Sequence, residues 1–230
     1  MTHEIFKKTL FRLARSNASG LFIGFAFENM SNLIPVKKVS DDDKVIVFYH
    51  PVKHWEQHLL IVPKKSIRRF LSLNLDDSES RELLLSIYKT ATETATKQGM
   101  HKYTILVNGG EYQDVPQVHF HLASGKDKTS KVLGQEKYKG LDENGVIFES
   151  KYIYVQEERG PDGKISIVFS PKEQIAPIGD LNFDDEKVRL VLTDLMRTSQ
   201  QIIRRLNPKG YTLLTNQGVG KKLSFHLLYE

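Results

Sequence analysis

The stretch Leu73-Asn-Leu-Asp-Asp77 recurs as Leu181-Asn-Phe-Asp-Asp185, 108 residues later in a chain of 230 residues. Other pairs at the same offset are Pro63-Lys64 with Pro171-Lys172, Tyr103-Thr-Ile-Leu106 with Tyr211-Thr-Leu-Leu214, and Asn108 with Asn216. The offset holds without a gap from residue 45 to residue 110, which indicates a duplicated structural unit. Beyond residue 110 the second copy is three residues shorter, which places Phe225-His-Leu227 opposite Phe120-His-Leu122.

Each copy predicts two strands, a helix and two more strands. In the first copy the strands are expected at residues 44–49, 58–62, 103–108 and 117–122. The helix is expected to begin at Asp76, with Glu79 as its partner in a capping box, and to end before Gly99. In the second copy the strands are expected at 152–155, 165–169, 211–215 and 223–228, and the helix from about 185 to 207. The fold class is therefore α+β with antiparallel strands.

Neither copy has enough strands to cover its own sheet edges, so we expect the copies to join in one extended sheet as an internal pseudo-dimer. The predicted division is an amphipathic docking helix at residues 1–20, a first repeat that carries the site at 21–125, a linker at 126–144, and a degenerate repeat at 145–230.

Composition limits the function classes. The net charge of +5 suits an anionic small molecule and is too small to indicate a nucleic-acid binder. The sequence has no apolar run long enough for a membrane span, so no membrane partner is expected. The absence of cysteine excludes disulfides and cysteine-based zinc sites, and it is compatible with a cytoplasmic protein.

Histidines on an alternating strand are the candidate chemical groups. Val118, Phe120 and Leu122 alternate with Gln117, His119 and His121. This alternation predicts a strand with one buried face and one open face, on which the polar side chains lie about 7 Å apart. A neutral imidazole is a competent nucleophile near neutral pH, although a polar residue on a strand also occurs by chance.

The first copy resembles the histidine triad family, whose members have an Asn-x-Gly loop followed by Gln-x-Val-x-His-x-His-x-His. Here the loop is Asn108-Gly-Gly110 and the motif is Gln113-Asp-Val-Pro-Gln-Val-His-Phe-His121. The stretch from His58 to Pro63-Lys64 is similar to the family's strand that ends in Ile-Pro-Lys. Tandem copies are similar to the galactose-1-phosphate uridylyltransferase and diadenosine tetraphosphate phosphorylase branches.

The resemblance implies nucleotidyl transfer or hydrolysis at an α-phosphate, with a nucleotide as partner and with no metal and no cofactor. His119 holds the place of the nucleophile and His121 that of an assisting donor, while Gln117 replaces the first histidine of the triad and orients by its amide. The expected substrate-binding residues are Asn108, Gly110, Gln113, His58 and His50. His50 stands where many members carry a ribose-binding Asp.

The second copy carries Ser224 in place of His119, so we expect no catalysis there and a packed or vestigial His226. A nucleotide-binding regulator without catalytic activity is the alternative to an enzyme, and a nucleic-acid-end processor is a third hypothesis. Asn108 also fits a simple turn, and His54 and His58 also fit an exposed strand end. The base, the leaving group, the acceptor and further oligomerisation stay open.

Overall fold

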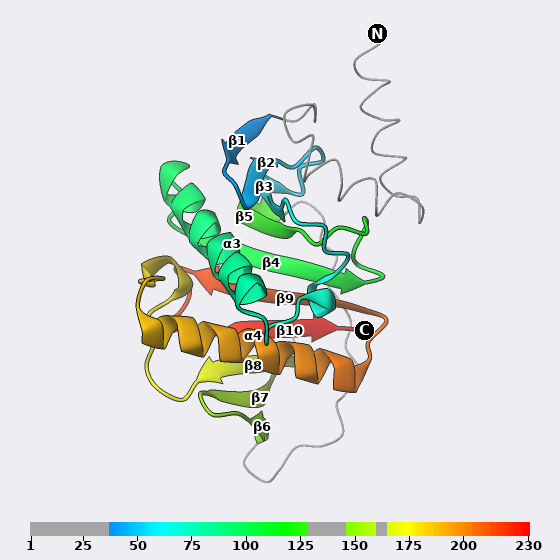
Figure 1. Cartoon of the computed structure of the whole chain (residues 1–230), viewed down its shortest axis with the longest axis vertical. Coiled ribbons are helices and arrows are strands. Elements are labelled where there is room, and N and C mark those ends of the chain that lie inside the picture. Colours follow the sequence, from blue (N-terminus) through cyan, green and yellow to red (C-terminus); the bar gives the residue numbers. More distant parts are fainter. Residues whose placement is uncertain (1–36, 128–145, 160–164) are drawn as a thin grey trace.

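One ten-stranded antiparallel sheet organises the chain (Figure 1). The computed structural model describes residues 37–127, 146–159 and 165–230. The helix expected at residues 1–20 lies outside these ranges, and so does all but the start of the linker expected at 126–144.

The two halves of the chain have the same elements in the same order. The first half contains β1 (Lys38–Asp41), β2 (Val45–Tyr49), β3 (Trp55–Pro63), η2 (Phe70–Ser72), α3 (Ser78–Lys97), β4 (Tyr103–Gly110) and β5 (Phe120–Asp127). The second half contains β6 (Val146–Glu149), β7 (Ile153–Arg159), β8 (Ile165–Pro171), η3 (Ile178–Asp180), α4 (Glu186–Leu206), β9 (Gly210–Gln217) and β10 (Phe225–Tyr229). The strand order β1-β2-β3-β5-β4-β9-β10-β8-β7-β6 reads the same from either end once each strand is replaced by its counterpart. The predicted duplication is confirmed.

The two halves meet where β4 pairs with β9. In this pairing Leu106 faces Leu214, which is its own counterpart at the 108-residue offset. A pseudo-twofold axis therefore passes between these two residues. Two symmetry-related hydrogen bonds flank the axis: Thr212 Oγ1 donates to Asn108 Oδ1 and Thr104 Oγ1 donates to Asn216 Oδ1, both at 2.7 Å. The expected internal pseudo-dimer with one extended sheet is confirmed.

Helices α3 and α4 cover the same face of the sheet and leave the other face without a helix among the described elements (Figure 1). Tyr88 and Met196, counterparts on the two helices, meet near the axis at 3.4 Å.

The expected start of α3 was one residue early, because Asp77 rather than Asp76 caps the helix by accepting from Ser80 N. Helix α4 is capped by Asp185 and agrees with the helix expected from about 185 to 207. Neither helix is long and apolar enough to span a bilayer.

The outermost strands β1 and β6 were not predicted. Each has four residues and pairs with a single neighbour through an interrupted register. Such short, half-buried edge strands lack a sustained alternation of apolar and polar residues, so the sequence pattern gives little sign of them.

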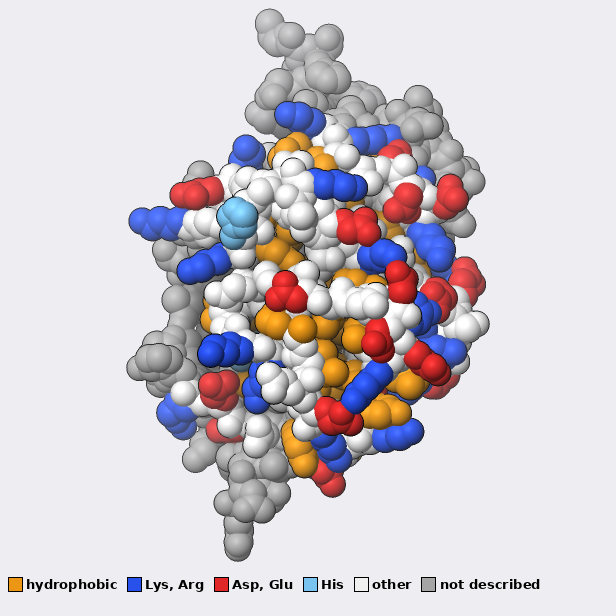
Figure 2. All heavy atoms as spheres, turned by 90° about the vertical axis from the view of Figure 1, so that its left-hand side faces the viewer, with side chains coloured by type: hydrophobic (Ala, Val, Ile, Leu, Met, Phe, Trp, Pro, Cys, Tyr) orange, Lys and Arg blue, Asp and Glu red, His pale blue; other side chains and the backbone are white. Residues whose placement is uncertain are grey.

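Ion pairs between the helical regions follow the same symmetry. Arg197 pairs with Asp76 at 3.0 Å, and the counterparts Lys89 and Asp184 pair at 3.4 Å. Arg189 also pairs with Glu82 of the first half. Acidic and basic side chains intermingle over the face shown in Figure 2.

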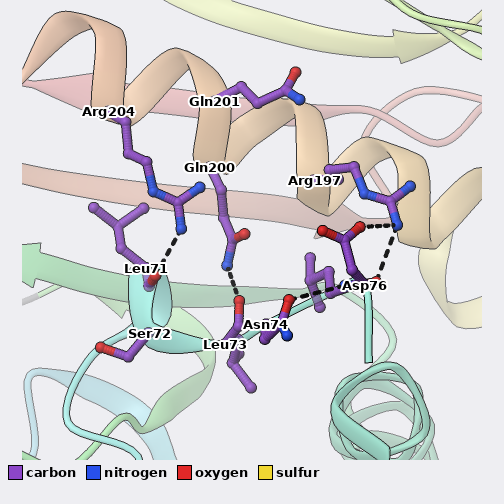
Figure 3. Close-up of a pocket in the computed structure, with 10 residues that line it drawn as sticks. Leu71, Ser72, Leu73, Asn74, Asp76, Arg197, Gln200, Gln201 and Arg204 are labelled. Carbon is purple, nitrogen blue, oxygen red and sulfur yellow. Dashed lines mark hydrogen bonds and ion pairs between the residues drawn. The ribbon is translucent and has the colours of Figure 1, made fainter. Parts of the chain in front are cut away.

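Helix α4 holds the segment that connects β3 to α3 by donating to its backbone carbonyl groups (Figure 3). Gln200 Nε2 donates to the carbonyl oxygens of Phe70 and Leu73, and Arg204 donates to that of Leu71. The far end of this segment, residues 63–68, contacts the loop that precedes β5, so the second half helps to position the histidine strand of the first.

The pairing of β4 with β9 forms the seam between the two halves, and a substitution of Gly109 tests it. A Cβ atom at this position would overlap the ring of Tyr211 on the neighbouring strand. We expect Gly109→Ala to lower the free energy of unfolding by about 1–3 kcal/mol in urea denaturation, as overpacking of a filled site does. In a Tyr211→Ala background the same change has room, and its cost should fall below about 1 kcal/mol. Equal costs in the two backgrounds would mean that the two residues do not meet.

Candidate functional site

Four imidazoles converge on the sheet face opposite the helices. His121 on β5 pairs with Leu60 on one side and Leu106 on the other, and His58 lies on β3. The ring centroids of His119 and His121 are 5.0 Å apart, and those of His58 and His121 are 5.2 Å apart. His50 stacks on His58 with a centroid distance of 4.1 Å. Of the expected site residues, these four come together.

The hydrogen bond of His119 sets its tautomer. Its Nδ1 lies 2.8 Å from the backbone oxygen of Gln117. A carbonyl oxygen only accepts, so Nδ1 carries the proton and Nε2 keeps a free lone pair. Burial lowers the pKa of His119, which keeps the ring neutral. His119 therefore has the protonation state that a nitrogen nucleophile needs.

A chain of hydrogen bonds sets the tautomer of His121. The backbone N–H of His54 donates to His58 Nδ1 at 3.4 Å, so the proton of neutral His58 is on Nε2. His58 Nε2 in turn lies 2.9 Å from His121 Nδ1 and donates to it. The proton of His121 is then on Nε2, a buried atom for which the described residues provide no hydrogen-bond partner. Within the described part of the chain, this N–H is an unused donor beside His119.

His50 and His58 are held neutral by burial and by their neighbours. Burial, followed by the charge that nearby His54 and His119 would carry, lowers the pKa of His50 to about 4. Burial, followed by the effect of His50 and His54, lowers the pKa of His58 to about 3. His58 is 0% exposed, so the alternative of an exposed strand end is wrong for this residue. Trp55 packs edge-on against its ring at 4.8 Å and contributes to this burial.

Gln117 does not lie on the open face beside the histidines, and that expectation was wrong. Its side chain is 0% exposed. Its amide donates to the backbone oxygens of Pro63 and Lys65, both at 3.0 Å, and its Oε1 accepts from Ile67 N at 3.2 Å. The expected strand over 117–122 accordingly begins only at Phe120. Gln117 ties the loop before β5 to the segment after β3.

Gln113 has a similar environment, since its Nε2 donates to the backbone oxygens of Arg68 and Val115 at 2.6 and 2.7 Å. Both of its amide protons are therefore committed to the loop. Gly110 has a φ of +61°, and a Cβ atom there would overlap the carbonyl group of Lys209. The conformation and the close approach both require glycine.

Asn108 lies next to the histidines on the neighbouring strand. Leu106 pairs with His121, so Asn108, two residues further along β4, lies on the same face and near His119. Its Oδ1 accepts from Thr212, which turns its two amide protons away from the seam. Asn108 is not a simple turn residue, because it lies within β4 and its side chain accepts a hydrogen bond from Thr212 of the second half.

The corresponding position in the second half has one imidazole. His226 is the counterpart of His121, and Ser224 Oγ lies 3.3 Å from its Nε2. The counterparts of His50 and His58 at the 108-residue offset are Glu158 and Ser166. The second half therefore has neither the nucleophile nor the imidazole chain of the first.

The depressed pKa values of His50 and His58 make stability depend on pH. In the unfolded chain an imidazole has a pKa near 6.5, so between pH 6.5 and the folded pKa the unfolded state binds more protons and stability falls as the pH falls. At pH 5.0 each of these histidines costs about 2 kcal/mol relative to pH 7.5. We expect His50→Gln, which removes one such group, to reduce this loss by about 1–2 kcal/mol in urea denaturation.

The matched control is His101→Gln, at an exposed position away from the cluster, which should retain the pH dependence of the unchanged chain. The same loss of stability in His50→Gln and in the unchanged chain would contradict the buried, neutral state of His50.

Comparison with known proteins agrees with this geometry. Residues 31–128 match the family model of the HIT domain. An uncharacterized HIT-like protein from Methanocaldococcus jannaschii is 32% identical over 120 residues, which make up 51% of this chain and 91% of that protein.

Two solved structures cover most of the chain. A GalT-like protein from Arabidopsis thaliana has a TM-score of 0.52 at 12% identity, over 89% of this chain and 81% of its own. A uridylyltransferase mutant has a TM-score of 0.52 at 9% identity, over 83% of this chain and 77% of its own. At these identities the likeness concerns the fold, which is the tandem arrangement of two similar halves. The chain belongs to the HIT, or histidine triad, family and has the tandem fold of the GalT-like proteins.

Proposed function

We propose that this protein hydrolyses or transfers nucleotidyl groups at an α-phosphate through a covalent nucleotidyl-His119 intermediate. The observation that carries the proposal is the hydrogen bond from His119 Nδ1 to the Gln117 carbonyl group, because it leaves the Nε2 lone pair free for attack in a neutral ring. Membership of the HIT family supports a nucleotide as the substrate class.

In the first step His119 Nε2 forms a bond to the α-phosphorus while the bond from phosphorus to the leaving group breaks. The N–H at His121 Nε2, for which the described residues provide no partner, then donates to a phosphate oxygen or to the departing group, whose negative charge grows as the bond breaks. The amide protons of Asn108 are placed to bind a second phosphate oxygen. In the second step water or another acceptor attacks phosphorus, the bond to Nε2 breaks, and the acceptor loses a proton.

The hydrogen bond between His58 and His121 sets the tautomer of His121 in this mechanism. Because His58 donates to His121 Nδ1, His121 is restricted to the tautomer that carries its proton on Nε2. A substitution that removes His58 would permit the other tautomer, in which Nε2 has no proton to donate. His58 is thus a positioning residue that acts through His121.

A nucleotide-binding regulator is the second candidate function, and Gln117 is the observation that favours it. Both amide protons of Gln117 bond to backbone oxygens, so this side chain has no donor left for a substrate. The regulator hypothesis predicts nucleotide binding without turnover.

Separate replacement of His119 and His121 distinguishes the two candidate functions. We expect His119→Ala to abolish turnover, because it removes the group that forms the intermediate, and His121→Ala to lower kcat/KM about 100- to 1,000-fold, because it removes one donor. Turnover is measured by chromatography on nucleoside phosphoramidates, dinucleoside polyphosphates and nucleotide sugars, which also distinguishes the leaving groups.

The matched control is Ser224→Ala, at the second-half counterpart of His119, which should retain full activity. Undiminished turnover in His119→Ala would refute the covalent mechanism. Nucleotide binding by the unchanged chain with no turnover on any of the three substrate classes would favour the regulator.

A further inference from the structure

We propose that His50, His58 and His121 together bind one late first-row transition-metal ion, such as Zn²⁺, through one ring nitrogen each. The nitrogen atoms that these three side chains offer all lie within 4.8 Å of one another. The site takes no ligand from cysteine or from a carboxylate, and its three ligands come from the end of β2, from β3 and from β5.

The spacing is close to what a metal ion requires. A Zn–N bond is about 2.0–2.1 Å long, so two nitrogen ligands at a tetrahedral angle lie about 3.4 Å apart. His58 Nε2 and His121 Nδ1, now 2.9 Å apart, would separate by about 0.5 Å, and His50 would move toward them. His50 has room for this movement, because it is partly exposed and stands at the end of its strand.

The three rings are suitable ligands because a metal ion binds the neutral form of imidazole. Imidazole nitrogen is a favourable ligand for zinc, copper and nickel, which this site should therefore prefer over magnesium or calcium. Water or a phosphate oxygen would complete the coordination as the fourth ligand.

Metal binding would replace specific hydrogen bonds. The ion would take the place of the proton between His58 and His121, and each ring would keep one proton on its other nitrogen. His50 and His58 would then lose the bonds that their Nδ1 atoms accept, at 3.0 Å from the N–H of Val52 and at 3.4 Å from that of His54. Val52 is exposed, so its N–H can bond to water instead.

His50 supplies the third ligand of the proposed metal site. Without it, His58 and His121 are a hydrogen-bonded pair that offers two ligands. In the second half the counterparts of His50 and His58 are Glu158 and Ser166, so the same fold brings one imidazole to that position. Convergence of three imidazoles is therefore a property of the first half and not a consequence of the fold.

An effect of the metal ion on turnover rests on the proposed function, whereas the binding of the metal ion does not. A metal ion on His121 Nδ1 would leave the proton on Nε2 but would separate this ring from His58 by about 0.5 Å, which shifts the N–H that donates to the substrate, so bound Zn²⁺ should inhibit turnover. Binding is measured in the absence of nucleotide, and a protein without turnover would leave that measurement unaffected.

The test is calorimetric titration of the metal-free full chain with Zn²⁺, followed by equilibrium dialysis to count the bound ions. We expect one ion per chain and a loss of affinity of about 100-fold or more in His50→Gln and in His58→Gln, since even the loss of an outer contact to a metal ligand costs about 10- to 100-fold. Co²⁺ in place of Zn²⁺ should give visible absorption bands that His50→Gln removes.

His101→Gln is the control at an exposed histidine and should bind Zn²⁺ as the unchanged chain does. Because His58 is fully buried, circular dichroism must show that its variant is folded; His50 is partly exposed, and its variant decides the result if the other is not. No retained Zn²⁺ in the unchanged chain, or equal affinity in folded His50→Gln, would overturn the proposal.

Discussion

The antiparallel pairing of β4 with β9 is the constraint from which the other features of this structure follow. It places Leu106 opposite its own counterpart Leu214, so one axis relates the strands, the helices and the ion pairs of both halves. Without it, each half would be a five-stranded sheet with the long strand β4 or β9 as an exposed edge. The pairing also puts α3 and α4 on one face of the sheet (Figure 1). The imidazoles lie on the opposite face.

Symmetry of the fold coexists with asymmetry of the chemistry. The seam uses equivalent residues on both sides, as in the two hydrogen bonds between threonine and asparagine. The corresponding site positions of the two halves carry different residues, because Ser224 and Ser166 stand where the first half has His119 and His58. The second half nevertheless contributes to the first, since Gln200 and Arg204 hold the segment that Gln117 ties to the histidine strand (Figure 3). The degenerate copy thus has a structural reason to be retained.

Much of the fold was predictable because both copies carry the same pattern, and the helix expected from about 185 to 207 in the second copy agrees with α4. The edge strands β1 and β6 were missed, because strands of four residues are too short to give a clear period. The alternation of residue types predicted that His119 and His121 lie side by side, and their rings do so, although β5 begins only at Phe120.

Two features of the site were beyond the sequence pattern. Alternation predicted an open face for Gln117, but its amide satisfies three backbone groups of a distant segment, and burial of those groups without a partner would be costly. The approach of His50 to His121 depends on β3 lying between their strands, a contact of residues about 70 positions apart. The alternation gave no sign of this contact, whereas the resemblance to the histidine triad family had placed His50 among the expected substrate-binding residues.

Covalent attachment of a nucleotide to His119 is detected most directly by mass spectrometry of the peptide that carries it. The chain is mixed with a nucleoside phosphoramidate labelled at the α-phosphate, stopped in alkali within one turnover, and digested. A phosphorus–nitrogen bond to imidazole survives alkali and breaks in acid, so the account predicts an alkali-stable, acid-labile nucleotidyl group on the peptide that contains His119. Turnover without this adduct, or an adduct on another residue, would contradict the account.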